Sequence, residues 1–125
     1  MRYLLLIYGD ESTYGESSEA DREATMKLWW EYDAAIRAAG ASAAGEALEP
    51  TSTATSVRDD DGTPLVTDGP FAETREQLGG YFLIDAKDKD DAIAIAARIP
   101  MARRGTVEVR QVMEIPGLAA ERNER

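Results

Sequence analysis

Histidine and cysteine are both absent from this chain of 125 residues. Without cysteine there is no disulfide framework, no thiolate nucleophile and no zinc-thiolate cluster, and the absence fits a reducing cytosol. Without histidine there is no Ser-His or Cys-His catalytic pair, no His general base and almost no route to a zinc site. These two absences exclude most common catalytic arrangements, and we expect neither a metal nor a cofactor.

Positive charge is also scarce, because 14 basic residues face 24 acidic ones and the formal net charge is −10. Such a surface repels phosphate backbones and anionic lipids, so neither nucleic acid nor a membrane is an expected partner. Single arginines such as Arg58, Arg75 and Arg110 stand in acidic or apolar surroundings, where they could hold a small anion. The alternative is that they are solvated or form structural ion pairs.

Long hydrophobic runs are missing as well, and the longest apolar stretches have the length of strands. The apolar start of the chain is too short for a signal peptide and has no small-residue cleavage site after it. We therefore expect a cytoplasmic protein with one domain over residues 1–115. Residues 116–125 are polar and are expected to form a flexible tail.

The first half of the chain predicts a strand, a helix, a strand and a hairpin. Residues 2–8 are apolar on both alternating faces, which is typical of a strand in the middle of a sheet. Ser18 and Asp21 resemble a capping box, and the helix they begin should reach Ala39. A short strand over 43–48 and a hairpin over 53–67 follow. The Asp59 to Gly62 run in the hairpin favours a turn over a hard-cation site.

The predicted helix carries an apolar stripe and one aromatic residue outside it. The stripe consists of residues at helical spacing, namely Ala24, Leu28, Tyr32, Ala35, Ile36 and Ala39. Trp30 lies off this stripe, so a long loop or a subunit interface has to cover it.

The second half predicts a short helix over 68–78, a strand over 81–86, a second helix and a final strand over 106–115. Asp88 and Asp91 cap the second helix, which Pro100 ends. Its predicted buried stripe consists of Ala92, Ile95, Ala96 and Ile99.

This order of elements predicts an α+β protein with a ferredoxin-like, split β-α-β antiparallel sheet, an inserted hairpin and both helices on one face. The second face of the sheet is then bare. Because the first strand is apolar on both faces, pairing two sheets across a homodimer is the economical cover.

The last predicted strand alternates between apolar and polar residues. Its apolar set, which should face the helices, consists of Val107, Val109, Met113 and Ile115. Glu108 and Arg110 should then project from the bare face, together with Tyr81 from the neighbouring strand. They are either a structural ion pair or the polar end of a pocket.

The stretch from Thr67 to Tyr81, TDGPFAETREQLGGY, closely resembles the DGPF-containing branch of the YCII-related family. The resemblance continues through 91–100 and 105–110 and includes residues 5–10, so that it covers nearly the whole chain. It implies the dimeric α/β-barrel variant of the ferredoxin-like fold. Arg75 stands where this branch usually has Lys, and Gln111 where Pro commonly follows Val-Arg.

The resemblance implies little about activity. Broader members of the family are suspected to be enzymes because a His and an Asp meet in a cleft, a role that this chain cannot share without histidine. Members of the DGPF branch are described as transcription-initiation proteins, and some are associated with sigma factors.

Two functional hypotheses follow. The first is a small acid/base enzyme, a lyase, isomerase or hydrolase for a small anionic or carbonyl compound. Asp68 would be its general base, Arg110 would bind the anion or oxyanion, and Tyr81 or Tyr8 would donate a proton. It predicts a carboxylate with a raised pKa.

The second hypothesis is a non-catalytic dimer that senses a metabolite in the same pocket and meets a protein such as a sigma factor. It predicts an exposed apolar patch around Trp29 and Trp30. Under both hypotheses the binding residues are Tyr8, Gly69, Pro70, Phe71, Glu73, Arg75, Glu76 and Glu108. The alternative for the motif is turn chemistry alone, with Asp68 capping the short helix.

Overall fold

The computed structural model describes residues 1–15 and 17–118 and contains a four-stranded antiparallel sheet in the order β2-β5-β1-β6. The elements of this body are β1 (Arg2–Gly9), α1 (Glu19–Ala38), β2 (Ser42–Ala47), β5 (Gln77–Asp85), α2 (Lys89–Ala97) and β6 (Thr106–Gln111). The element order and strand order confirm the predicted α+β, ferredoxin-like arrangement.

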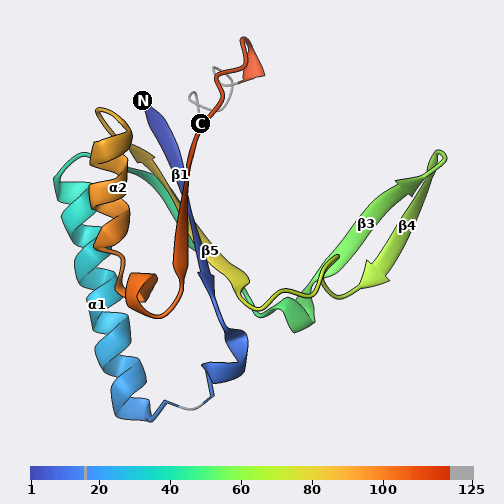
Figure 1. Cartoon of the computed structure of the whole chain (residues 1–125), viewed down its shortest axis with the longest axis horizontal. Helices are drawn as coiled ribbons and strands as arrows, with labels where there is room; N and C mark the ends of the chain where they lie inside the picture. The colour runs from blue at the N-terminus through green and yellow to red at the C-terminus, as the bar shows by residue number, and fades with distance from the viewer. Residues whose placement is uncertain (16, 119–125) are drawn as a thin grey trace.

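Both helices cover the same face of the sheet, as predicted (Figure 1). The core lies between them and the strands, and its fully buried side chains are Leu5, Ile36, Ile84 and Ile99. Aromatic rings extend this core, because Phe82 packs 6.3 Å from Trp29 and 5.4 Å from Tyr32, measured between ring centroids. The Tyr32 hydroxyl donates a hydrogen bond of 2.8 Å to the Ile95 carbonyl and thereby joins the two helices.

Both predicted helix starts are confirmed. The Ser18 side chain accepts a hydrogen bond from the Asp21 N–H, and the Asp88 side chain accepts one from the Asp91 N–H. These bonds satisfy N–H groups that have no partner inside the helix. The stripe predicted for α2 is also buried, from Ala92 to Ile99.

The predicted stripe on α1 is wrong for most of its members. Tyr32 and Ile36 are buried, but Leu28 is exposed and Trp29 packs on the core in its place. The buried side of the helix runs from Trp29 through Tyr32 to Ile36, because the large Trp29 ring, rather than Leu28, stacks on Phe82. Trp30 is 68% exposed, and no part of the described chain buries it.

The final strand is shorter than predicted. Val107 and Val109 pack against the core as expected, but Met113 and Ile115 are exposed beyond the end of β6. The reason is that β6 pairs only with β1, whose ladder ends when the Val112 N–H donates to the Arg2 carbonyl. Of the predicted tail, residues 119–125 lie outside the described residues.

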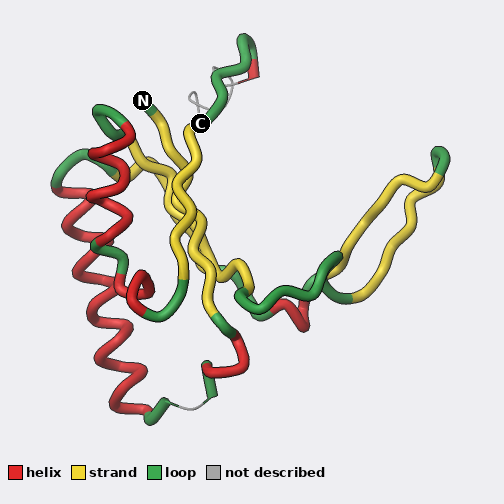
Figure 2. Tube along the Cα trace, in the orientation of Figure 1, coloured by secondary structure: helices red, strands yellow, loops and turns green. Residues whose placement is uncertain are grey.

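The predicted hairpin forms a two-stranded sheet of β3 (Thr55–Asp60) and β4 (Thr63–Asp68) that projects from the body (Figures 1 and 2). We call residues 55–68 the arm. Asp61 and Gly62 form its tip with φ angles of 52° and 87°, and the Gly62 N–H donates to the Asp59 carboxylate. The triple-Asp run therefore shapes a primed hairpin turn.

The short helix predicted over 68–78 does not form. Between β4 and β5 the chain runs as bends, drawn as loop in Figure 2, and β5 begins four residues earlier than predicted, at Gln77. Gly69 has a φ of 97°, which is incompatible with a helix, and its N–H donates to the Ala54 carbonyl at 2.7 Å. Gly69 therefore closes the root of the arm.

In the described part of the chain, no helix combines the length and apolar character needed to cross a bilayer.

Candidate functional site

The face of the sheet opposite the helices carries a band of partly exposed apolar side chains. Leu4, Leu6 and Tyr8 contribute from β1, and Leu78, Tyr81 and Leu83 from β5. The register sets these residues side by side, with Leu4 opposite Leu83 and Leu6 opposite Tyr81. We call this surface the open face, because no other element of the described chain covers it (Figure 1).

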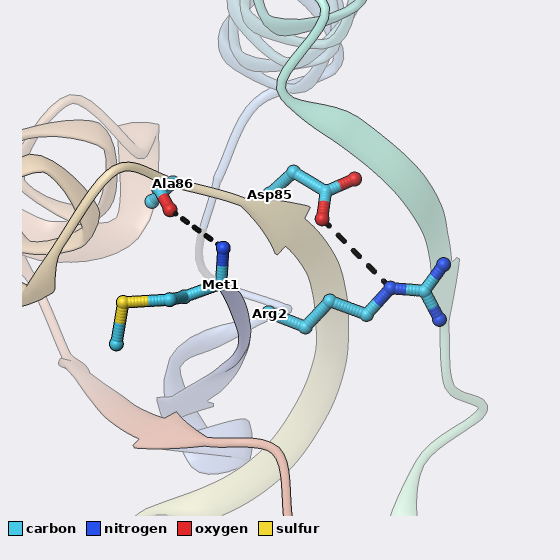
Figure 3. Close-up of polar contacts among 4 residues, drawn as sticks. All are labelled: Met1, Arg2, Asp85 and Ala86. Carbon is cyan, nitrogen blue, oxygen red and sulfur yellow. Dashed lines mark hydrogen bonds and ion pairs between the residues drawn. The ribbon is translucent and has the colours of Figure 1, made fainter. Parts of the chain in front are cut away.

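Charged residues flank the open face. Glu108 stands opposite Leu6 and Arg110 opposite Leu4, both exposed on the edge strand β6, as the alternation predicted. Glu108 and Arg110 form no ion pair within 4 Å, so a solid structural pair between them is not what the described residues show. At the far end of β1, Arg2 pairs with Asp85 at 3.8 Å, beside a hydrogen bond from the Met1 ammonium to the Ala86 carbonyl (Figure 3).

A hollow of about 530 Å³ opens at the opposite end of the sheet. It forms where β1 ends, because the antiparallel register places the starts of β5 and β6 beside that point: Tyr8 lies opposite both Leu78 and Thr106. The lining residues come from the segments next to these strand ends and from the start of α1, and they are Asp10, Thr13, Ser17, Asp21, Arg75, Glu76 and Arg104. We call it the arginine hollow.

Two carboxylates of the arginine hollow already have hydrogen-bond donors. Asp10 accepts from the Ser12 hydroxyl at 2.6 Å and from the Ser12 N–H at 2.9 Å, and Glu76 accepts from the Thr106 hydroxyl at 2.8 Å. The Ser12 hydroxyl lowers the pKa of Asp10 most, followed by the Ser12 N–H, with a smaller contribution from the charge of Arg75. Asp10 is therefore an ionised acceptor at neutral pH.

Arg75 and Arg104 are the cations of this hollow. Among the described residues neither forms an ion pair within 4 Å, although three carboxylates share the lining with them. Arginine keeps its charge at any physiological pH and offers a planar fork of donors that matches a carboxylate or a phosphate. The hollow thus holds two guanidinium groups available to an anionic ligand.

Glu11 ties the loop beside this hollow to the root of the arm. Its N–H donates to the Gln77 side chain at 2.9 Å. Its carboxylate accepts from the Thr51 N–H at 2.8 Å and from the Thr51 hydroxyl at 2.6 Å. Thr51 begins the short 3-10 turn that leads into β3, so the two segments share one hydrogen-bonded junction.

Tyr14 lies against two glycines at the same end of the sheet. A Cβ atom at Gly9 would come within 3.0 Å of the Tyr14 hydroxyl, and one at Gly79 within 3.5 Å. Burial raises the pKa of Tyr14 most, and the charges of Glu11 and Asp10 raise it further. The phenol is therefore neutral near pH 7 and able to donate a hydrogen bond.

The predicted site residues lie in three separate places. Tyr8, Tyr81, Glu108 and Arg110 lie on or beside the open face, whereas Arg75 and Glu76 line the arginine hollow.

The third group lies at the root of the arm. Asp68 ends β4, and Gly69, Pro70, Phe71 and Glu73 follow it in the connection to β5. Phe71 is 90% exposed. Within one chain the arm extends away from the four-stranded sheet (Figure 1), so Asp68 belongs to a different sheet from Arg110 and Tyr81.

The sequence interpretation missed most of the arginine hollow, namely Asp10, Thr13, Ser17, Asp21 and Arg104. A signal was present, because Asp10 directly follows the first strand and Arg104 shortly precedes the last. Antiparallel pairing of these strands would have placed both residues at one end of the sheet.

A second hollow of the described surface is lined by fewer charged side chains. It has a volume of about 400 Å³ and lies at the Met1 end of the sheet, where Gln111 lines it together with Arg2 and Glu114. No cluster of three or more His, Cys, Asp or Glu suited to a metal ion occurs within 1–15 and 17–118.

Comparison with known proteins gives a family but no activity. The family model described as the YCII-related domain matches residues 1–116. An uncharacterized protein from Rhizobium meliloti (strain 1021) is 37% identical over 112 residues, which cover 88% of this chain and 90% of that protein.

Proposed function

This chain belongs to the YCII-related family, and we propose that it binds a small organic anion in the arginine hollow. The observation that carries this proposal is the pair of guanidinium groups, Arg75 and Arg104, which line one hollow without an ion-pair partner among the described residues. Two arginines around one cavity are a common means of holding a carboxylate or phosphate.

The other lining groups narrow the ligand class. Asp10, Asp21 and Glu76 give the hollow three negative charges against two positive ones, so a purely anionic ligand would meet repulsion on one side. A ligand that also carries hydroxyl or ammonium donors would satisfy these carboxylates. We therefore favour a small hydroxy- or amino-carboxylic acid.

Binding is better supported than acid/base catalysis. In the arginine hollow the pKa of Asp10 is lowered, which suits a hydrogen-bond acceptor for a ligand rather than a general base. The catalytic set of Asp68, Arg110 and Tyr81 would also require Asp68 to approach the open face from outside its own chain. The raised pKa of Tyr14 keeps its phenol protonated at neutral pH, which suits a hydrogen-bond donor better than a catalytic acid.

Calorimetric titration with three matched dicarboxylates tests the proposal. We expect malate and aspartate, which carry a hydroxyl and an ammonium group, to bind more tightly than succinate, which carries neither. Arg75→Gln and Arg104→Gln should each weaken binding about tenfold or more, since each removes a charge-assisted hydrogen bond worth about 1.5–3 kcal/mol. Arg37→Gln on α1, whose partner is Asp33, serves as the control. Equal binding by all variants would refute the site.

We further propose that a second copy of the chain covers the open face. The band from Leu4 to Leu83 supports this, because it leaves apolar side chains half-covered on the two central strands. Sedimentation velocity should detect a dimer that Leu6→Glu dissociates. Leu28→Glu, on an exposed part of α1, is the matched control and should leave it intact. A wild-type monomer at every concentration would disprove this partner.

A further inference from the structure

The arm exposes apolar side chains on a ribbon that has no cover of its own. Val57 and Val66 stand opposite each other and are 65% and 61% exposed. An isolated two-stranded hairpin is marginally stable in water, and stable sheets need a third strand or a packed face. The arm therefore has a reason to pack against something outside its own chain.

The two faces of the arm differ in chemistry. The pairing register puts Val57, Val66 and Pro64 on one face, whereas the other face carries Arg58 opposite Leu65. On the first face these three apolar residues lie together, between Asp59 near the tip and the Thr55–Asp68 pair at the root. We call it the valine face.

We propose that the valine face of the arm packs against a second copy of this chain, so that each copy of a dimer grips the other. This inference rests on the dimer proposed above and adds a second contact to it. Figure 1 shows the arm projecting from the side of the sheet opposite the helices, which is the side on which a second copy would lie. A strand of six residues spans about 20 Å, enough to reach across much of a small domain.

The area of the interface also supports a second copy of the chain as the partner of the arm. Four strands spaced about 4.8 Å apart and about six residues long give the open face a flat area of about 400 Å². A standard stable interface buries about 800 Å² per partner. One face of the arm measures about 20 by 10 Å, or about 200 Å². In a two-fold dimer each copy gives one arm and receives another, which adds about 400 Å² and roughly doubles the flat contact area.

The junction at Glu11 would hold the arm in a defined direction. Because Thr51 donates two hydrogen bonds to the Glu11 carboxylate, the strand that follows it leaves the body from a fixed point. A defined exit lowers the entropy lost when the arm docks.

Two valine-to-threonine changes test the valine face. Threonine keeps the shape and strand preference of valine, so the Val57→Thr/Val66→Thr double variant should retain the hairpin while making its face polar. We expect the dimer dissociation constant from sedimentation to rise about tenfold or more. Leu65→Thr on the opposite face is the control and should change it less than threefold.

A spin label locates the arm directly. The chain has no cysteine, so a nitroxide on Thr63→Cys near the tip would be the single label. Labelled chains are mixed with unlabelled chains enriched in ¹⁵N, and line broadening then reports contacts between copies. We expect broadening of amides in the ¹⁵N copy at a protein concentration where the dimer forms.

The outcomes separate the two proposals. A wild-type dimer that the double variant leaves unchanged, or whose ¹⁵N copies show no broadening, would overturn the arm contact and leave the open-face dimer standing. A wild-type protein that sediments only as a monomer would overturn both.

Discussion

The two faces of the four-stranded sheet are built from similar residues, but only one is buried within the chain. On β1, Tyr3, Leu5 and Ile7 face the helices and are buried, whereas the alternate residues from Leu4 to Tyr8 face outward and are half-exposed. The open face therefore resembles a core surface that lacks its second layer. This difference indicates that one face stabilises the monomer and that the other is suited to association.

The largest expected effect comes from truncating one leucine on each face. Leu5→Ala should lower the free energy of unfolding by about 2–5 kcal/mol, because a fully buried side chain leaves a cavity. Leu6→Ala should cost less than about 1.5 kcal/mol in the monomer, since its surroundings are half-exposed. Urea unfolding at two protein concentrations checks both values. Only the Leu6 effect should depend on concentration, and the comparison fails if the two variants behave alike.

The next effect concerns the hydrogen bond that joins the two helices on the buried side of the sheet. Tyr32→Phe removes the donor to the buried Ile95 carbonyl and should cost about 1–2 kcal/mol in urea unfolding. Burial raises the pKa of Tyr32 from 10.0 to about 12, so the folded state favours the neutral phenol. Its contribution to stability is complete below pH 10 and is lost as the pH rises toward 12.

Melting temperatures of wild type and Tyr32→Phe between pH 8 and 12 isolate this contribution, because the other tyrosines are common to both proteins. The difference between the two curves should shrink above pH 10. A constant difference would show that Tyr32 does not titrate as its surroundings imply.

A smaller effect is expected at the root of the arm. Glu11→Gln keeps the shape of the side chain but removes the charge that strengthens its two bonds from Thr51, and should cost about 1 kcal/mol. Amide hydrogen exchange should show faster exchange at Thr51, while Ile84 in the buried core keeps its protection. Faster exchange at both sites would mean that the junction stabilises the whole domain.

The smallest effect is expected at the Arg2–Asp85 pair. This pair spans 3.8 Å between partly exposed side chains, and such pairs contribute little. Arg2→Gln should change the free energy of unfolding by less than about 0.5 kcal/mol. A loss above 1 kcal/mol would indicate that something outside the single chain shields this end of the open face from solvent.

Local rules in the sequence predicted local structure well. Ser18 with Asp21 and Asp88 with Asp91 marked both helix starts, because a cap needs only residues three positions apart. The Asp-Gly tip of the arm was equally readable, since it requires φ values that glycine and aspartate tolerate.

Predictions failed where long-range packing decides. The stripe on α1 was displaced because the choice between Leu28 and Trp29 depends on Phe82, which is more than fifty positions away. The helix expected over 68–78 was replaced by bends because Gly69 bonds to Ala54 across the arm. The arginine hollow was not predicted for the same reason, because its residues come together from beside three strand ends and from the start of α1.

The root of the arm has a further consequence for how this chain can change. Ala47 pairs with Gly80, and the Leu48 N–H donates to the Gly79 carbonyl, so β2 and β5 are neighbours that a tight turn could join. The residues between them form an excursion whose ends already meet. Loop-closure entropy grows slowly, by about 0.6 kcal/mol for each doubling of length. Insertions and deletions in this excursion should therefore leave the sheet register intact, so that the arm can change in length without disturbing the fold of the body.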